Sequence, residues 1–215
     1  AGYIGCEQAA PILLKIMAEQ EGLGGGYYTG IATIHERKLY YRKVIGDVST
    51  LMSETDAKEL PGTIGIIHSR TKSGGNVEWG HPFVDEYERM AYIANGSGGY
   101  FEEERDKNSV AQSLFDAGHI FRSRTPGPTG KYPLLSDGTS LHVSEVMCHL
   151  IESFIPECGG PVEAMHKAFI TFPSELVGLM VHIDIPDCIV ASRINQPLLI
   201  GRDDKATYLA TTAMA

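Results

Sequence analysis

A short apolar run, Ile64-Gly-Ile-Ile67, sets the strongest limit on the fold, and it ends directly in His68, Ser69 and Arg70. Branched apolar residues without polar alternation predict a strand that is buried on both faces. Such a strand belongs inside a layered domain, and its end brings polar side chains to the end of a sheet. We therefore expect a site where this strand ends.

A second β-type run, Met90 to Ala94, ends in Asn95-Gly96. Asn-Gly is ordinarily a tight turn. An Asn amide beside a glycine N–H can also form an oxyanion hole, because both donors can converge on one developing negative charge. The pairing of two strand ends that carry polar residues favours the second interpretation.

Arg70 follows the first run and suits a carboxylate ligand, since its planar guanidinium can hold both oxygens at once. An exposed arginine in a surface ion pair is the alternative interpretation. The sequence by itself does not decide between the two.

Length and charge place limits on the class of protein. The 215 residues suit one compact domain, 1–215. The net charge of −9 argues against nucleic acid and anionic membrane surfaces as partners, and favours a small-molecule substrate. There is no apolar run long enough to span a bilayer and no basic-then-apolar start, so a cytoplasmic location is expected.

No metal or cofactor site is predicted from the spacing of its residues. The four cysteines show no CxxC pair, which gives no sign of a zinc site or a disulfide framework. No GxGxxG or Walker-type loop opens a helix after a strand, so nucleotide binding loses support. Histidines such as His119 and His149 are assigned structural roles.

The order of periodic segments predicts an α+β fold, with strands first, then helices, then an antiparallel meander. Helices are expected near Pro11–Met17 and over Ser49–Leu60, Glu102–Gly118, Ser144–Phe154 and Gly160–Phe172. Outside the two central runs, strands are expected over Tyr28–Ile34, Lys38–Val44, Val177–Asp184, Cys188–Ile194, Pro197–Ile200 and Tyr208–Thr211. The Gly-, Pro- and Ser-rich segment Ser123–Ser140 is either a lid or a disordered loop.

The motifs taken together resemble the glutaminase domain of class II glutamine amidotransferases, most closely that of the glucosamine-6-phosphate synthase family. The resemblance covers essentially the whole chain, and the joint spacing is more specific than any single motif. The motifs that carry it, in chain order, are Gly2-Tyr-Ile-Gly5, Gly24 to Gly30, His68-Ser-Arg70, His81-Pro82, Asn95-Gly96, Ala191-Ser-Arg193 and Pro197-Leu-Leu-Ile-Gly201.

The resemblance implies an N-terminal-nucleophile hydrolase fold, a four-layer αββα sandwich. It implies that a cysteine at the start of the mature chain attacks the amide of glutamine, with its own α-amine as the base, and that ammonia leaves. An α-amine titrates near neutral pH, so it can take the thiol proton. Asn95 and Gly96 match the family's oxyanion hole. Arg70 matches the residue that binds the substrate carboxylate, and His81 matches the histidine of the neighbouring loop.

The start of the chain departs from the family pattern. The family has Cys-Gly-Ile before the Gly-Tyr-Ile-Gly run, and this sequence begins at Ala1. Either the nucleophilic cysteine lies just upstream of Ala1, or the protein lacks it; an alignment with Ala1 itself in place of the cysteine needs a gap before the first helix. Cys6 has no α-amine and is expected to be an inert buried thiol.

The substrate pocket departs as well. Thr71 and the residues after it replace the family's gating tryptophan and histidine, although Ser73 retains a hydroxyl. Val143 stands where the family has the aspartate that holds the substrate α-amine. Asp137 is one candidate replacement for that carboxylate, and a substrate other than glutamine is the alternative.

The sequence therefore predicts an enzyme, an amidohydrolase of the glutamine amidotransferase type, without a cofactor. The alternatives are a catalytically silent domain of the same fold that binds a ligand or regulates a partner, and an amidase for another amide. Because ammonia is useful only when it is passed on, the resemblance also implies a synthase domain or subunit as partner.

Overall fold

The computed structural model describes residues 1–97 and 106–213, and its core contains two large antiparallel sheets. The larger sheet, in spatial order, consists of β11 (Leu199–Arg202), β12 (Ala206–Ala210), β1 (Gly2–Gly5), β4 (Ile64–Arg70), β2 (Tyr28–His35) and β3 (Lys38–Ile45). The smaller sheet consists of β10 (Ile189–Arg193), β9 (Glu175–His182), β6 (Met90–Ser97) and β5 (Phe83–Val84).

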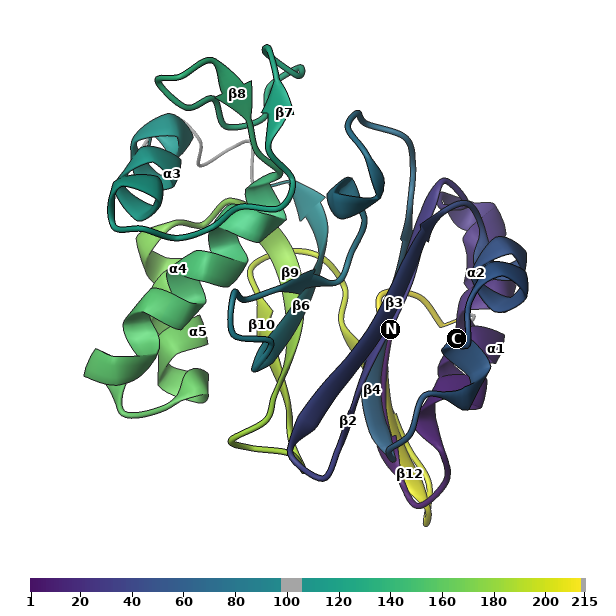
Figure 1. The fold of residues 1–215 in the computed structure, drawn as a ribbon. Coiled ribbons are helices and arrows are strands. Elements are labelled where there is room, and N and C mark those ends of the chain that lie inside the picture. Colours follow the sequence, from purple (N-terminus) through teal and green to yellow (C-terminus); the bar gives the residue numbers. More distant parts are fainter. Residues whose placement is uncertain (98–105, 214–215) are drawn as a thin grey trace.

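Helices cover the outer face of each sheet, while the inner faces pack against one another (Figure 1). The larger sheet is covered by α1 (Ala9–Gln20) and α2 (Val48–Glu54), and the smaller sheet by α4 (Val143–Cys158) and α5 (Pro161–Thr171). A further helix, α3 (Lys107–Asp116), lies beside a two-stranded ladder of β7 (Thr125–Pro126) and β8 (Thr139–Ser140).

Three apolar clusters fill the spaces between the four layers. One joins α1 and α2 to the larger sheet, one lies between the sheets, and one joins the smaller sheet to α4 and α5. Strand β4 contributes to two of them, because successive side chains of a strand point to opposite faces. Ile67 packs toward α1 and Ile66 packs between the sheets. The predicted burial of this strand on both faces, and the αββα sandwich, are confirmed.

Most predicted elements agree with the structure to within a few residues. The first hairpin turns at Glu36 and Arg37, whose positive φ angles of 50° and 59° are typical of a two-residue type I′ turn. The segment expected as one helix over Ser49–Leu60 is instead α2 followed by a 3₁₀ turn at Ala57–Glu59. The expected Glu102–Gly118 helix is described only from residue 106 onward, where α3 lies.

The predicted antiparallel meander at the end of the chain is wrong in its pairing. Strands β9 and β10 belong to the smaller sheet, whereas β11 and β12 belong to the larger one. The chain therefore crosses between the sheets after Arg193. Periodicity shows which face of a strand is buried but not which strand lies beside it, so the sequence pattern did not reveal the crossing.

Candidate functional site

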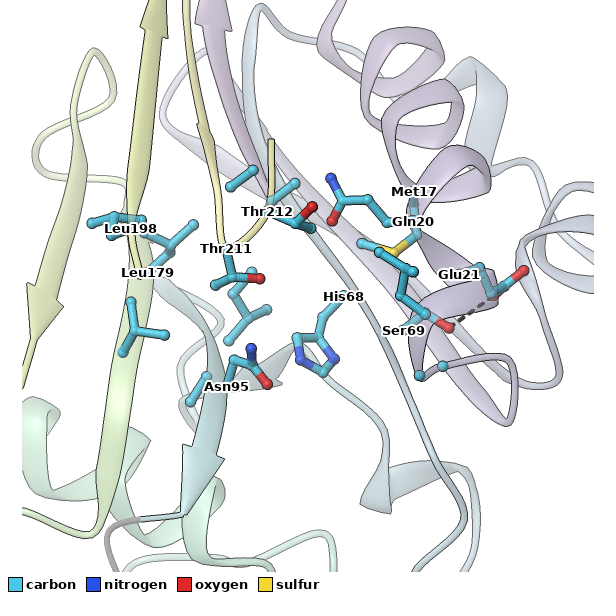
Figure 2. Close-up of a pocket in the computed structure, with 18 residues that line it drawn as sticks. Met17, Gln20, Glu21, His68, Ser69, Asn95, Leu179, Leu198, Thr211 and Thr212 are labelled. Carbon is cyan, nitrogen blue, oxygen red and sulfur yellow. Dashed lines mark hydrogen bonds between the residues drawn. The ribbon is translucent and has the colours of Figure 1, made fainter. Parts of the chain in front are cut away.

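A two-lobed cavity lies at the end of the inner sheet faces, where β4 and β6 both finish. The lobes have volumes of about 220 and 440 Å³ and share the walls formed by His68 and Ser69 of β4 and Ala94 and Asn95 of β6. Figure 2 shows the Asn95 amide and the His68 ring on one side of the smaller lobe and Ser69 bonded to Glu21 on another. The two strand ends that the sequence singled out thus line one cavity.

The smaller lobe is bounded by the beginning of β1. The α-amine of Ala1 donates to the carbonyl of Ile67 at 2.8 Å, and the N–H of Ile67 donates to the carbonyl of Ala1 at 2.9 Å. These bonds continue the register in which Gly2 lies opposite Ile66. Ala1 is therefore held beside the cavity wall formed by β4.

Asn95 and Gly96 lie inside strand β6 rather than in a turn. Gly96 has a φ of +82°, and a Cβ there would lie 2.9 Å from the Leu176 side chain. Glycine is therefore required by both backbone conformation and space. Both residues line the larger lobe, which places the Asn95 amide and the Gly96 backbone on one cavity wall.

Arg70 lines the same lobe and is held by neutral groups. Its guanidinium donates to the carbonyl of Trp79 at 2.9 Å and to the hydroxyl of Tyr132 at 2.8 Å, and it also contacts Nε2 of His142. No ion pair of Arg70 with a carboxylate is found in the described part of the chain, so the interpretation as a surface ion pair is wrong. An anionic ligand that enters this lobe therefore meets the Arg70 guanidinium, whose positive charge is not neutralised by an ion pair with a described residue.

Three imidazoles stand beside Arg70. His81 lies with its ring centroid 4.3 Å from that of His68 and 5.5 Å from that of His142. Burial, followed by nearby positive charges, lowers the pKa of His68 to about 3, and burial lowers the pKa of His81 and His142 well below the usual value. All three rings are therefore neutral at physiological pH and leave Arg70 as the cation of this cluster.

Glu175 supplies a carboxyl group to the larger lobe. It is 2% exposed, and it accepts hydrogen bonds from Tyr92 Oη at 2.5 Å and from Ser144 Oγ. Burial raises the pKa of Glu175 to about 7, against the lowering effect of these hydrogen bonds and of Arg70. The lobe thus carries a cationic group and a titratable acid.

Four of the five predicted site residues line the cavity, namely Arg70, His81, Asn95 and Gly96. Ser73 lines neither lobe, and its buried hydroxyl has no hydrogen-bond partner in the described part of the chain.

Two further residues concern the carboxylate that was expected to hold the substrate α-amine. Val143 does line the larger lobe. Asp137 lies outside both lobes, where it is exposed and accepts hydrogen bonds from Thr139 and Arg124. Asp137 is therefore the wrong candidate for a replacement carboxylate.

Sequence reasoning missed three contributors to this wall, Glu175, Tyr132 and His142. Tyr132 comes from Ser123–Ser140, the segment expected to be a lid or disordered, which the structure shows as a loop closed by the β7–β8 ladder. Cys6 was expected to be buried and is exposed instead. The missed residues carry no local motif, because they come together only when the layers pack.

The chain is similar over nearly its whole length to part of two longer enzymes. It is 30% identical over 205 residues to glutamine–fructose-6-phosphate aminotransferase (isomerizing) of Thermosynechococcus vestitus, covering 93% of this chain and 29% of that protein. It is 27% identical over 212 residues to the protein of the same name from Pyrococcus horikoshii, covering 98% of this chain and 31% of that protein. The chain thus spans less than a third of either relative.

Solved structures share the fold. The glutamine phosphoribosylpyrophosphate amidotransferase of B. subtilis, solved in complex with ADP and GMP, superposes with a TM-score of 0.71 at 19% identity, covering 98% of this chain and 41% of that one. No family model matches the sequence. No helix among the described residues is long and apolar enough to cross a bilayer.

Proposed function

We propose that this chain, which belongs to the class II glutamine amidotransferase family of N-terminal-nucleophile fold, is a glutaminase domain that releases ammonia from glutamine. The observation that carries the proposal is that Arg70, the Asn95-Gly96 pair and the beginning of β1 all border one cavity between the sheets. Each corresponds to a different task in amide hydrolysis, and their convergence is not required by the fold's apolar core.

The proposal assigns the nucleophile to a cysteine that precedes Ala1. Ala1 lies opposite Ile67, so the three residues before it, in the same antiparallel register, face His68, Ser69 and Arg70 in turn. With Cys-Gly-Ile in these places, the cysteine is opposite Arg70. Residues directly opposite on antiparallel strands project to the same face, and the Arg70 side chain projects into the cavity.

The chemistry then follows from the groups at this wall. The cysteine thiol gives its proton to its own α-amine, and the sulfur forms a bond with the side-chain carbonyl carbon of glutamine. The Asn95 amide and the Gly96 N–H stabilise the negative charge on the carbonyl oxygen. The C–N bond breaks as the α-ammonium returns the proton to the leaving ammonia. Water then hydrolyses the thioester to glutamate and the free thiol.

Arg70 and Glu175 are suited to hold the ends of the amino acid that do not react. The guanidinium of Arg70 binds the α-carboxylate. The carboxyl of Glu175 binds the α-ammonium and thereby takes the role of the aspartate that Val143 replaces. An ammonium placed beside Glu175 favours its ionised form, because an opposite charge lowers the pKa that burial has raised.

The use of the ammonia belongs to a further domain or subunit. The matched relatives are about three times as long as this chain, and their names describe transfer of an amino group to a sugar phosphate. We therefore propose an ammonia-accepting synthase partner. A cytoplasmic location fits the four cysteines, which are all free thiols in the structure.

The experiment compares two chains that differ in one residue, Cys-Gly-Ile or Ser-Gly-Ile ahead of Ala1, each with its first residue exposed. Glutamate release from glutamine is measured by a coupled assay, and glutamine binding by calorimetry. Release by the Cys chain alone supports the proposal. Binding without release by the Cys chain supports the catalytically silent domain, and neither binding nor release by a folded Cys chain contradicts glutamine as the ligand.

A further inference from the structure

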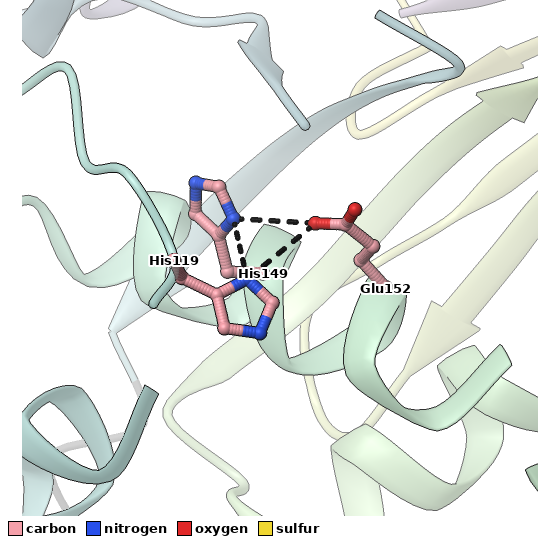
Figure 3. A group of neighbouring side chains, drawn as sticks. All are labelled: His119, His149 and Glu152. Atoms are coloured by element: carbon pink, nitrogen blue, oxygen red, sulfur yellow. Dashed lines mark hydrogen bonds and ion pairs between the residues drawn. The ribbon is translucent and has the colours of Figure 1, made fainter. Parts of the chain in front are cut away.

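A second cluster of polar side chains lies on the far portion of α4, about two helical turns beyond His142. His149 and Glu152 are one turn apart on this helix, and His119 reaches them from the segment after α3 (Figure 3). Three atoms converge there, Nδ1 of His119, Nδ1 of His149 and Oε2 of Glu152. None of these residues lines the two-lobed cavity.

The spacing of the three atoms matches the edges of a metal coordination tetrahedron. The two Nδ1 atoms are 3.2 Å apart, and Oε2 of Glu152 lies 3.3 Å from Nδ1 of His149 and 3.6 Å from Nδ1 of His119. Ligands about 2.05 Å from a tetrahedral ion are about 3.3 Å from one another, and those of an octahedral ion about 2.9 Å. The observed distances fit the tetrahedron better.

We propose that His119, His149 and Glu152 form a Zn²⁺ site whose fourth position is taken by water. Two imidazole nitrogens and one carboxylate oxygen are a donor set that zinc accepts, whereas calcium and magnesium select all-oxygen sets. The site goes beyond the proposed glutaminase function, because no step of amide hydrolysis passes through it.

Burial makes Oε2 of Glu152 costly to leave without a partner, whereas the two Nδ1 atoms lie within hydrogen-bond distance of one another. The His149 side chain is completely buried and that of Glu152 is 15% exposed. Oε2 of Glu152 has no hydrogen-bond partner in the described part of the chain. The ring of His149 packs edge-on against Phe121, with centroids 4.8 Å apart, and its Nδ1 is directed toward the other two atoms (Figure 3). A buried acceptor of this kind needs a partner, which a shared proton, a water molecule or a metal ion can supply.

The expected role of the ion is structural. It links the segment before Phe121 to α4, and the first turn of the same helix places Val143 and Ser144 on the cavity wall. Binding to the folded state alone raises the free energy of unfolding, since a preformed donor set rarely exists in the unfolded chain.

The test uses Co²⁺ as a spectroscopic probe with the full chain, free of any affinity tag. The exposed thiols of Cys6 and Cys188 are competing ligands, so the parent protein carries Cys6→Ser and Cys188→Ser. The parent is expected to bind one Co²⁺ with the visible absorption of a four-coordinate ion, and Zn²⁺ is expected to displace it and to raise the melting temperature.

Variants assign the site. His119→Asn and Glu152→Gln, both at partly exposed positions, are expected to weaken Co²⁺ binding by more than about 100-fold, a larger loss than an outer-shell change produces. His166→Asn on α5 is the matched control, because His166 is exposed and outside the cluster, and it is expected to bind as the parent does. Absence of binding by the parent overturns the proposal in favour of a shared proton, and full binding by either variant overturns the assignment of ligands.

Discussion

The hydroxyl of Tyr92 donates to Glu175 at 2.5 Å from within the apolar layer between the smaller sheet and α4. Tyr92 and Glu175 belong to adjacent strands, β6 and β9, and Ser144 of α4 donates to the other carboxyl oxygen. Burial and the Glu175 charge raise the pKa of Tyr92 well above its usual value, so its hydroxyl stays a donor. The carboxyl is therefore positioned by three elements at once.

Replacing Glu175 by Gln tests its role toward the substrate. Loss of a charge-assisted bond to the α-ammonium costs about 1.5–3 kcal/mol, which corresponds to a rise in KM of about 10- to 150-fold. The value of kcat is expected to change less, because the group does not touch the reacting amide. Steady-state kinetics of the Cys-led chain give both parameters.

Glu157→Gln is the control for this substitution. Glu157 lies on the same helix as Ser144, but it is exposed and pairs with Lys167. The KM of the Glu157→Gln variant is therefore expected to stay at the parent value. An unchanged KM in Glu175→Gln, with a normal fold, removes Glu175 from substrate recognition.

The same carboxyl predicts a pH dependence of stability. Its pKa is about 7 in the folded protein against an ordinary value of 4.5, so the folded state retains a proton that the unfolded state releases between these values. The free energy of unfolding therefore falls as pH rises from about 4.5 to about 7, by up to about 3 kcal/mol from this group. The stabilisation that Glu175 contributes is fully present below a pH of about 4.5 and is lost above a pH of about 7.

Urea unfolding of the parent and of Glu175→Gln at several pH values between about 4.5 and 8 isolates this contribution. The difference in unfolding free energy between the two proteins is expected to change with pH, because all other titrating groups are common to both. A difference that stays constant across the range contradicts a carboxyl that is protonated in the folded state.

Arg70→Lys tests the carboxylate end of the site. A lysine supplies a point charge but not the planar fork, and it cannot donate to the Trp79 carbonyl and the Tyr132 hydroxyl in the same geometry. We expect KM for glutamine to rise at least about 10-fold. Tyr132→Phe is the companion variant, since it removes one acceptor and keeps the guanidinium, and its KM is expected to change only a few-fold. A larger effect in Tyr132→Phe than in Arg70→Lys counts against Arg70 as the carboxylate ligand.

The sequence predicted the layers of the fold more completely than the residues that line the cavity. The sequence predicted strand β4 because Ile64, Ile66 and Ile67 are apolar residues typical of a buried strand. Arg70, Asn95 and Gly96 were then predicted as site residues because they lie at the ends of such strands. The role of Glu175 could not be predicted from the sequence. A glutamate that follows Ser174 gives the same local sequence pattern whether its side chain is solvated or buried.

The same limit explains the cluster on α4. His149-Leu-Ile-Glu152 has the one-turn spacing that places two ligands on one helix face, but the third ligand, His119, comes from 30 residues earlier. The pair of residues alone is common in structural helices. Whether this pair belongs to a three-residue cluster depends on how the segment after α3 packs, and sequence spacing does not show that packing.

Gly96→Ala tests the oxyanion role most sharply, because a matched control exists in the same chain. Alanine at a φ of +82° is strained, and its Cβ would lie 2.9 Å from the Leu176 side chain, so we expect the backbone at residue 96 to shift and to move its N–H. Loss of one oxyanion donor lowers kcat about 10²- to 10³-fold, while KM is expected to change little. Gly138 has a nearly equal φ of +83°, a Cβ added there would meet no atom within 4 Å, and it lies outside the cavity. Gly138→Ala is therefore expected to lose about 1–2 kcal/mol of stability and to keep its kcat. Equal kcat values for the two variants would show that the Gly96 backbone does not stabilise the reacting oxygen.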